Sequence, residues 1–219
     1  YAKIDTRIVP LRNEKNQKIC KSLNRWLEIA KGKYIARMDS DDITALDRFK
    51  IQYEFLENNP EIWIVWANME IMDEDGQVFS HRNYNYTDEM IRKKIFRYSP
   101  FCHASIMMQA NLLKSLNWYN IFLHDAEDYD LYFRMWIFTK FANLDKYLYT
   151  MRVNKKSVTY KNTKRMELLT LYIRLKAVNE YGYKMSIFDK WYWTLQYISV
   201  FLIPAKLKIW LYNLLRNSK

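Results

Sequence analysis

The stretch that decides the fold is Tyr34–Asp42, which reads YIARMDSDD. Its first half is a mainly apolar run of strand length. Its second half places three carboxylates, Asp39, Asp41 and Asp42, within four residues. Clustered carboxylates repel one another, and proteins commonly tolerate them where a hard divalent cation such as Mg²⁺ or Mn²⁺ takes oxygen ligands. The stretch therefore predicts either a metal site at the end of a strand or an acidic turn that caps the following helix.

Working outward, the flanking segments have helical spacing of apolar residues. Residues 16–31 predict a helix that Gly32 ends, and residues 45–59 predict a second helix that Pro60 stops. Alternation of strands and helices through the first two thirds of the chain favours an α/β fold, in which ligands bind at the carboxyl ends of strands. The predicted strands are 7–11, 34–38, 62–72, a short one restarting at 78–79, 105–108 and 146–152.

A second acidic pair, Glu127–Asp128, stands at the start of a helix predicted over residues 126–138. Acidic residues in a first turn are favoured by the helix dipole, which is sufficient reason for their presence. The alternative is that one carboxylate acts as a general base on a substrate hydroxyl. The pair by itself does not decide between these two interpretations.

The chain of 219 residues carries a formal net charge of +11, which favours anionic partners without choosing among them. Cys20 and Cys102 lie far apart and in no metal-ligand spacing, so reduced thiols in a cytoplasmic protein are the simpler interpretation. The first ten residues contain no secretory signal.

From about Thr163 the sequence predicts helices rich in Leu, Tyr and Trp, broken near Gly182 and Pro204. No uninterrupted apolar run approaches the roughly 20 residues that a membrane-spanning helix needs. Aromatic residues mixed with Lys and Arg suit a helix that lies on a membrane surface, although a helix packed on the rest of the protein, or on a partner, would have a similar sequence.

Together these motifs and their order resemble the family 2 glycosyltransferases, which have the GT-A fold. The similarity covers about residues 12–157. The resemblance implies an α/β chain with a partial GT-A fold that lacks its first βα units and carries a helical C-terminal extension. We expect residues 1–160 to form the catalytic domain, incomplete at its N-terminus, and residues 161–219 to form an amphipathic helical region. The segments that carry the resemblance are Ser22–Asn24, Ala30–Asp42, Arg48–Phe49, Gln52, Phe55–Leu56, Asn59–Pro60, Ser99–Ser105, Ala126–Leu131 and Phe141–Leu144.

The resemblance also implies roles for individual residues. Asp39 and Asp41 match the DxD motif that holds a divalent metal, Mn or Mg, and the ribose-diphosphate of the donor. Asp128 matches the acid that deprotonates the acceptor, with Glu127 beside it. His103 stands where the family often has a histidine near the sugar-diphosphate, but a structural histidine fits the position equally well.

The function implied is metal-dependent, inverting transfer of a sugar from a nucleotide-sugar, expected to be a UDP-sugar, to a hydroxyl. The acceptor would be a saccharide or lipid-linked molecule in polysaccharide or glycolipid synthesis, at the inner face of the cell membrane. One alternative is a remnant without activity that binds a membrane or a partner. Another is a basic nucleic-acid-binding module, which the absence of any recognised nucleic-acid motif disfavours.

Two departures from the family pattern stand out. The sequence opens after the strands that bind the nucleotide base and ribose in relatives, so a polypeptide starting at Tyr1 is expected to bind donor weakly and to expose a sheet edge. In addition, Trp26, Trp63, Trp66 and Trp118 stand where relatives often have Gly. Either these codons are recoded, so that the written Trp is wrong, or the gene is decaying.

Overall fold

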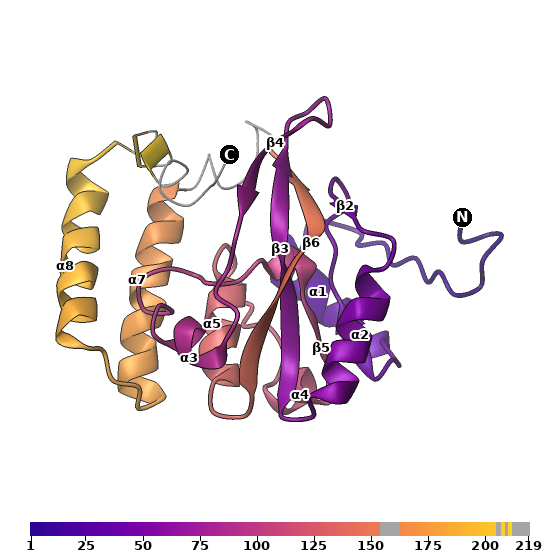
Figure 1. Ribbon diagram of the computed structural model, residues 1–219, viewed down its shortest axis with the longest axis horizontal. Coiled ribbons are helices and arrows are strands. Elements are labelled where there is room, and N and C mark those ends of the chain that lie inside the picture. Colours follow the sequence, from indigo (N-terminus) through magenta and orange to yellow (C-terminus); the bar gives the residue numbers. More distant parts are fainter. Residues whose placement is uncertain (154–162, 205–206, 209, 212–219) are drawn as a thin grey trace.

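The computed structural model describes residues 1–153, 163–204, 207–208 and 210–211. Its centre is a curled mixed sheet with strand order β1-β5-β3-β6-β2, to which β4 is added beside β3 (Figure 1). The described strands are β1 Tyr34–Ala36, β2 Ile43–Thr44, β3 Ile62–Met72, β4 Val78–Arg82, β5 Met107–Gln109 and β6 Lys140–Arg152.

The long strand β3 organises the sheet. It pairs in parallel with β6 along one edge. Its other edge is shared, because Ile64 and Val65 pair with β5 whereas the stretch from Met69 to Met72 pairs with β4. A strand with both edges paired and both faces covered is expected to be apolar throughout, and nearly all of β3 is buried.

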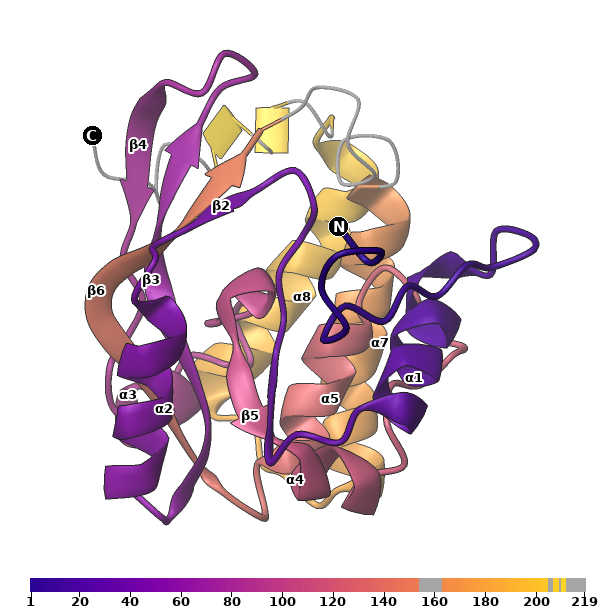
Figure 2. The ribbon, with the colours of Figure 1, turned by 90° about the vertical axis from the view of Figure 1, so that its right-hand side faces the viewer.

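Helices cover both faces of the sheet (Figure 2). On one face, α2 packs Leu56 against Ile62 and Val65. The larger core, on the other face, joins the sheet to α1, α3, α4, α5 and α7. The described helices are α1 Lys18–Ile29, α2 Arg48–Asn58, α3 Asp88–Arg92, α4 Ala110–Ser115, α5 Glu127–Met135, α7 Thr163–Glu180 and α8 Ile187–Leu202, with a short 3-10 turn, η1, at His103–Ser105.

The strand predicted at residues 7–11 is wrong, since this segment has no strand structure. Local contacts hold its backbone instead: the Asp5 carboxylate accepts a hydrogen bond from the Arg7 main chain at 2.9 Å and pairs with the Arg7 guanidinium at 2.7 Å. An apolar run becomes a strand only where a neighbouring strand pairs with it. In the part of the chain that the structure describes, β1 is paired only with β5.

Two of the tryptophans at expected glycine positions have strained or unsatisfied surroundings. Trp118, which follows α4, has a φ of 66°, a left-handed conformation that favours Gly. Trp66 is fully buried in β3, and its indole N–H has no hydrogen-bond partner among the described residues.

If these codons are recoded to Gly, protein from its native host is expected to have an intact mass below that of the written sequence, by one Trp-to-Gly difference per recoded position. Intact-mass spectrometry of native protein checks this. A mass equal to that of the sequence as written would eliminate recoding.

Candidate functional site

The acidic stretch follows β1 and is tied to the far end of β6. Tyr149 makes the link: its hydroxyl accepts a hydrogen bond from the Asp39 main-chain N–H at 3.1 Å and donates to the Asp42 carboxylate at 2.6 Å. Asp42 also accepts from the Arg152 main-chain N–H at 2.8 Å. Asp42 is buried and its carboxylate is used in these contacts, so it fixes the loop that presents its neighbours.

Asp39 and Asp41 have different surroundings. Asp39 lines a cleft of about 900 Å³, and its carboxylate pairs with the Arg37 guanidinium at 2.7 Å. Asp41 is exposed and is not among the residues that line this cleft, while its main-chain carbonyl accepts a hydrogen bond from Arg152 at 3.0 Å. Of the two predicted metal ligands, the structure therefore places only Asp39 in the cleft.

Glu127 and Asp128 line the same cleft from the first turn of α5. Asp125, two residues before the start of α5, helps to position Glu127. Its φ is 83°, and its main-chain N–H donates a hydrogen bond to the Glu127 carboxylate at 3.0 Å. Asp128 accepts from the Tyr129 N–H at 2.7 Å. Burial raises the pKa of Asp128 above its ordinary value, and the nearby Arg37 charge opposes the rise.

His103 also lines the cleft, held between two tyrosines. Its Nδ1 lies 2.7 Å from the Tyr132 hydroxyl and its Nε2 lies 3.1 Å from the Tyr119 hydroxyl. Burial and then the Arg37 charge bring the pKa of His103 well below its usual range, so the ring is neutral. Both ring nitrogens already have tyrosine partners, so His103 could bind the donor only by giving up one of these hydrogen bonds. The predicted donor-binding role of His103 stays a prediction.

Arg37 is the site residue that the sequence interpretation missed. Its side chain is 12% exposed, and it is the positive charge shared by Asp39, Glu127 and Asp128. Arg37 and Asp39 both follow the end of β1 at Ala36, so the contact between them comes from the loop conformation and is not given by strand alternation. Other basic residues that line the cleft are Lys15, Lys18, Arg82 and Arg165. This lining suits an anionic ligand such as a diphosphate.

The described residues contain no group of three or more His, Cys, Asp or Glu side chains placed to hold a metal ion. A divalent ion at Asp39 would therefore take few ligands from the protein and the others from water and phosphate oxygens. This is the usual arrangement for Mg²⁺ beside a nucleotide, and a half-exposed carboxylate in a cleft fits it.

The pKa of Glu127 makes folding stability depend on pH. Burial, and then the charge of Asp128, raises this pKa to about 7 from 4.5. The unfolded chain releases the proton above pH 4.5, whereas the folded protein keeps it to about pH 7. Stability from this group is therefore full below the lower value and is lost as the pH rises through the interval.

We expect Glu127→Gln to remove this loss. The free energy of unfolding of the variant, relative to wild type, should rise between about pH 5 and pH 7 by at most about 1.4 kcal/mol per pH unit. Urea unfolding at several pH values measures it. Glu180→Gln, at an exposed position on α7, is the control and should keep the wild-type profile. Parallel profiles for Glu127→Gln and wild type would contradict the prediction.

The architecture is the GT-A fold. It superposes on Staphylococcus aureus TarS residues 1–349 in complex with UDP-GlcNAc, with a TM-score of 0.52 and 16% identity, covering 84% of this chain and 62% of that one. It also superposes on the mannosyltransferase PcManGT of Pyrobaculum calidifontis in complex with GDP-Man and Mn²⁺, with a TM-score of 0.50 and 11% identity, covering 91% of this chain and 64% of that one.

The chain belongs to glycosyl transferase family 2, whose family model matches residues 1–116. An uncharacterized glycosyltransferase of Methanocaldococcus jannaschii is 30% identical over 78% of this chain and 60% of its own length. The amylovoran biosynthesis glycosyltransferase AmsE of Erwinia amylovora is 34% identical over 58% of this chain and 47% of its own length. The chain thus spans about half to three fifths of the length of these relatives.

Proposed function

We propose that this chain supplies the catalytic cleft of a glycosyltransferase that moves a sugar from a nucleotide-sugar donor, a UDP-sugar, to a hydroxyl acceptor with inversion. The observation that carries the proposal is that Asp39 and Asp128, which lie 89 residues apart in the sequence, line one cleft. A carboxylate that can bind a cation and a partly buried carboxylate that can accept a proton are the two groups that such a displacement needs.

In the proposed reaction the acceptor oxygen bonds to the anomeric carbon while the bond from that carbon to the diphosphate oxygen breaks. The acceptor proton passes to the Asp128 carboxylate. Arg37 holds Asp39 in place and lowers the pKa of Asp128, which keeps more of the base ionised. A divalent ion bound at Asp39, with Asp41 as a second predicted ligand, would neutralise charge on the departing diphosphate. A single displacement of this kind inverts the anomeric carbon.

The substrates belong to the proposal as well. Relatives include a protein named for amylovoran biosynthesis, and a structural neighbour holds UDP-GlcNAc. The other structural neighbour holds GDP-Man and Mn²⁺, so the two together support a nucleotide-sugar donor of either kind. We propose a UDP-sugar as donor and, as acceptor, a saccharide or lipid-linked molecule in surface polysaccharide or glycolipid synthesis. Work at the cytoplasmic face of the membrane follows from such an acceptor. The boundary between a catalytic region at 1–160 and a helical region at 161–219 stays a prediction.

The proposal is tested by release of nucleoside diphosphate from a panel of UDP- and GDP-sugars, with and without Mn²⁺. We expect release that needs the metal and is greatest with one UDP-sugar. If no donor releases nucleoside diphosphate, with or without Mn²⁺, and the chain still binds membranes, the result would favour the remnant without activity. Salt-sensitive binding of RNA in place of donor would favour the nucleic-acid module.

A further inference from the structure

We propose that the outward face of α8 rests on a bilayer that contains anionic lipids. This proposal names the surface by which the protein would bind at the membrane, and it depends on no step of the proposed reaction. In the part of the chain that the structure describes, no helix is long and apolar enough to cross a membrane, so contact would be along the membrane surface.

The inward face of α8 is attached through polar contacts. Asp189 caps the helix with Ser186 and pairs with Arg97 at 2.8 Å. The Gln196 side chain accepts a hydrogen bond at 2.6 Å from Arg174, a buried residue of α7. A surface helix of a globular protein usually turns its apolar side inward. In α8 the polar residues Asp189 and Gln196 face inward instead.

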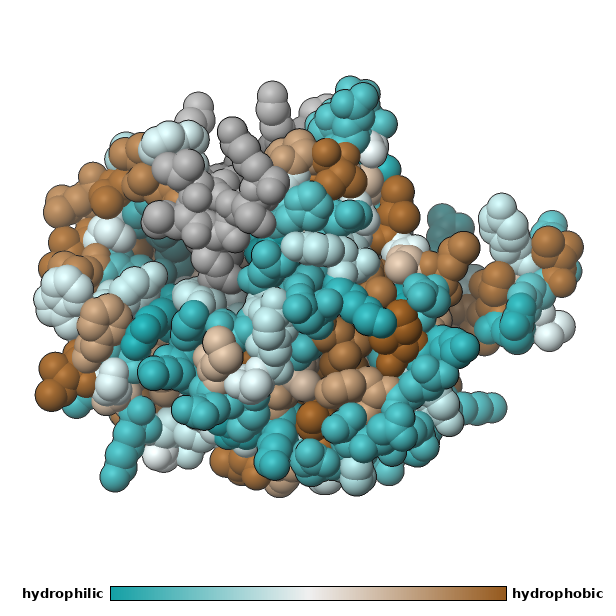
Figure 3. All heavy atoms as spheres, viewed as in Figure 1, coloured by the Kyte–Doolittle hydropathy of each residue, from teal (hydrophilic) through white to brown (hydrophobic). Residues whose placement is uncertain are grey.

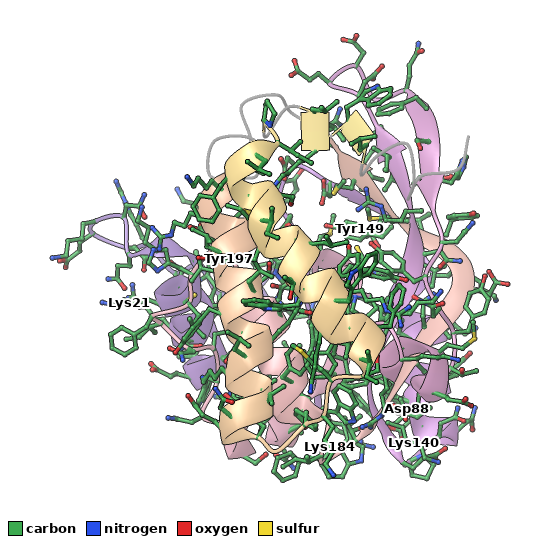
Figure 4. The ribbon with its side chains drawn as sticks, turned by 90° about the vertical axis from the view of Figure 1, so that its left-hand side faces the viewer. Lys21, Asp88, Lys140, Tyr149, Lys184 and Tyr197 are labelled. Atoms are coloured by element: carbon green, nitrogen blue, oxygen red, sulfur yellow. The ribbon has the colours of Figure 1, made fainter. Side chains whose placement is uncertain are left out.

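An apolar stripe runs along the outward side of α8. Five side chains spaced by three or four residues form one stripe, and each is at least 44% exposed. Figure 3 shows apolar side chains along the edge of the molecule formed by α8, and Figure 4 shows this helix standing outermost. We call this set the α8 stripe: Ile187, Trp191, Leu195, Ile198 and Leu202.

The charge around the α8 stripe selects an anionic surface. Lys184 and Lys190 are exposed at the start of the helix, and Lys184 is marked in Figure 4. In the sequence from residue 184 to residue 219 there are six Lys and Arg residues and one acidic residue, Asp189, which is used inward. Of these six, Lys208 already pairs with Glu167 at 2.8 Å. Each basic residue near an anionic membrane strengthens binding by about fivefold.

A second copy of the chain is a poorer occupant of the same face. It would bring a net charge of +11 and the same lysines against those already present. Like charges brought together across an interface oppose association. An anionic headgroup layer has the complementary charge, and a hydrocarbon boundary accepts the Trp, Leu and Ile side chains of the stripe.

The position of the stripe relative to the cleft suits a lipid-linked acceptor. Arg165 and Met166, in the first turn of α7, line the cleft. The same helix packs along α8, with the Trp193 indole N–H donating to the Leu171 carbonyl at 3.0 Å (Figure 4). A molecule resting on the α8 stripe would hold one wall of its cleft close to the bilayer.

The test is flotation with vesicles, using the purified chain without metal or nucleotide. Vesicles of phosphatidylcholine with phosphatidylglycerol should bind it, and binding should weaken in high salt. The triple variant Trp191→Ser, Leu195→Gln, Ile198→Ser should lose about a hundredfold in partitioning, because three apolar side chains that would enter the hydrocarbon boundary are removed. The matched control, Leu46→Gln, Phe79→Ser, Ile137→Asn, removes exposed apolar groups outside α8 and should bind like wild type.

A second measurement covers the case in which the triple variant does not fold. Both native cysteines are free and buried, so Leu195→Cys can be labelled at the surface with an environment-sensitive fluorophore. A blue shift with anionic vesicles supports insertion. No vesicle binding by wild type, no shift, or a stripe-dependent dimer with no lipid effect would overturn the proposal. Because no donor is present, these outcomes are separate from failure of the catalytic proposal.

Discussion

Asp128→Asn is expected to lower the rate of sugar transfer by about 10²–10⁴-fold, the usual contribution of a positioned general base. Asn has nearly the same shape and can still accept the hydrogen bond from the Tyr129 N–H, which lies 2.7 Å from the carboxylate in the wild type. It cannot take a proton from the acceptor. Donor affinity should therefore change little, and the loss should appear in kcat.

Steady-state transfer with one donor and a fixed acceptor measures this effect, and thermal unfolding shows whether the fold is intact. Asp75→Asn, in the exposed turn between β3 and β4, is the matched control and should retain activity. Because the pKa of Asp128 is raised, the wild-type rate should increase with pH as this group ionises. A variant within about threefold of wild type would remove Asp128 from the reaction.

Asp39→Asn is the second large effect that we expect. Loss of the carboxylate in the cleft should remove most of the metal response, at a cost of several kcal/mol in transition-state stabilisation, equivalent to about 10² in rate or more. Treating wild type with a chelator should have the same effect, and chelation should add little to the variant. Titrating Mn²⁺ against nucleotide release for both proteins measures the two effects together.

The neighbouring acids give built-in comparisons for this experiment. Asp41→Asn should weaken the metal response less than Asp39→Asn, since Asp41 does not line the cleft. Asp42→Asn should act on stability, because Asp42 is buried between Tyr149 and the Arg152 main chain. A variant at Asp39 with the wild-type response to Mn²⁺ would contradict the assignment.

The sequence predicted the core elements of the fold well where local pattern and burial agree. The continuous apolar run at residues 62–72 became β3, and the helix expected at 45–59 became α2. The strand prediction for residues 7–11 was wrong because an apolar run forms a strand only beside a partner strand. Strand pairing is a tertiary property that a local pattern does not contain.

The sequence interpretation named the acidic residues of the candidate site but not the arginine that balances their charge. The resemblance to family 2 singled out Asp39 and Asp128 in two separate motifs, and the fold places both in the lining of one cleft. The resemblance could not show that Asp42 is buried or that Asp41 lies outside the lining. Arg37 was missed because an isolated arginine has many structural uses, and its role depends on which acids the fold brings to it.

The most direct measurement is a crystal structure of the protein soaked with Mn²⁺ and UDP, with the metal located by its anomalous signal. The account predicts manganese bound to the Asp39 carboxylate, with the diphosphate in the cleft on the side facing Asp128. Manganese and nucleotide bound elsewhere, or a diphosphate on a surface that Asp128 does not face, would contradict it.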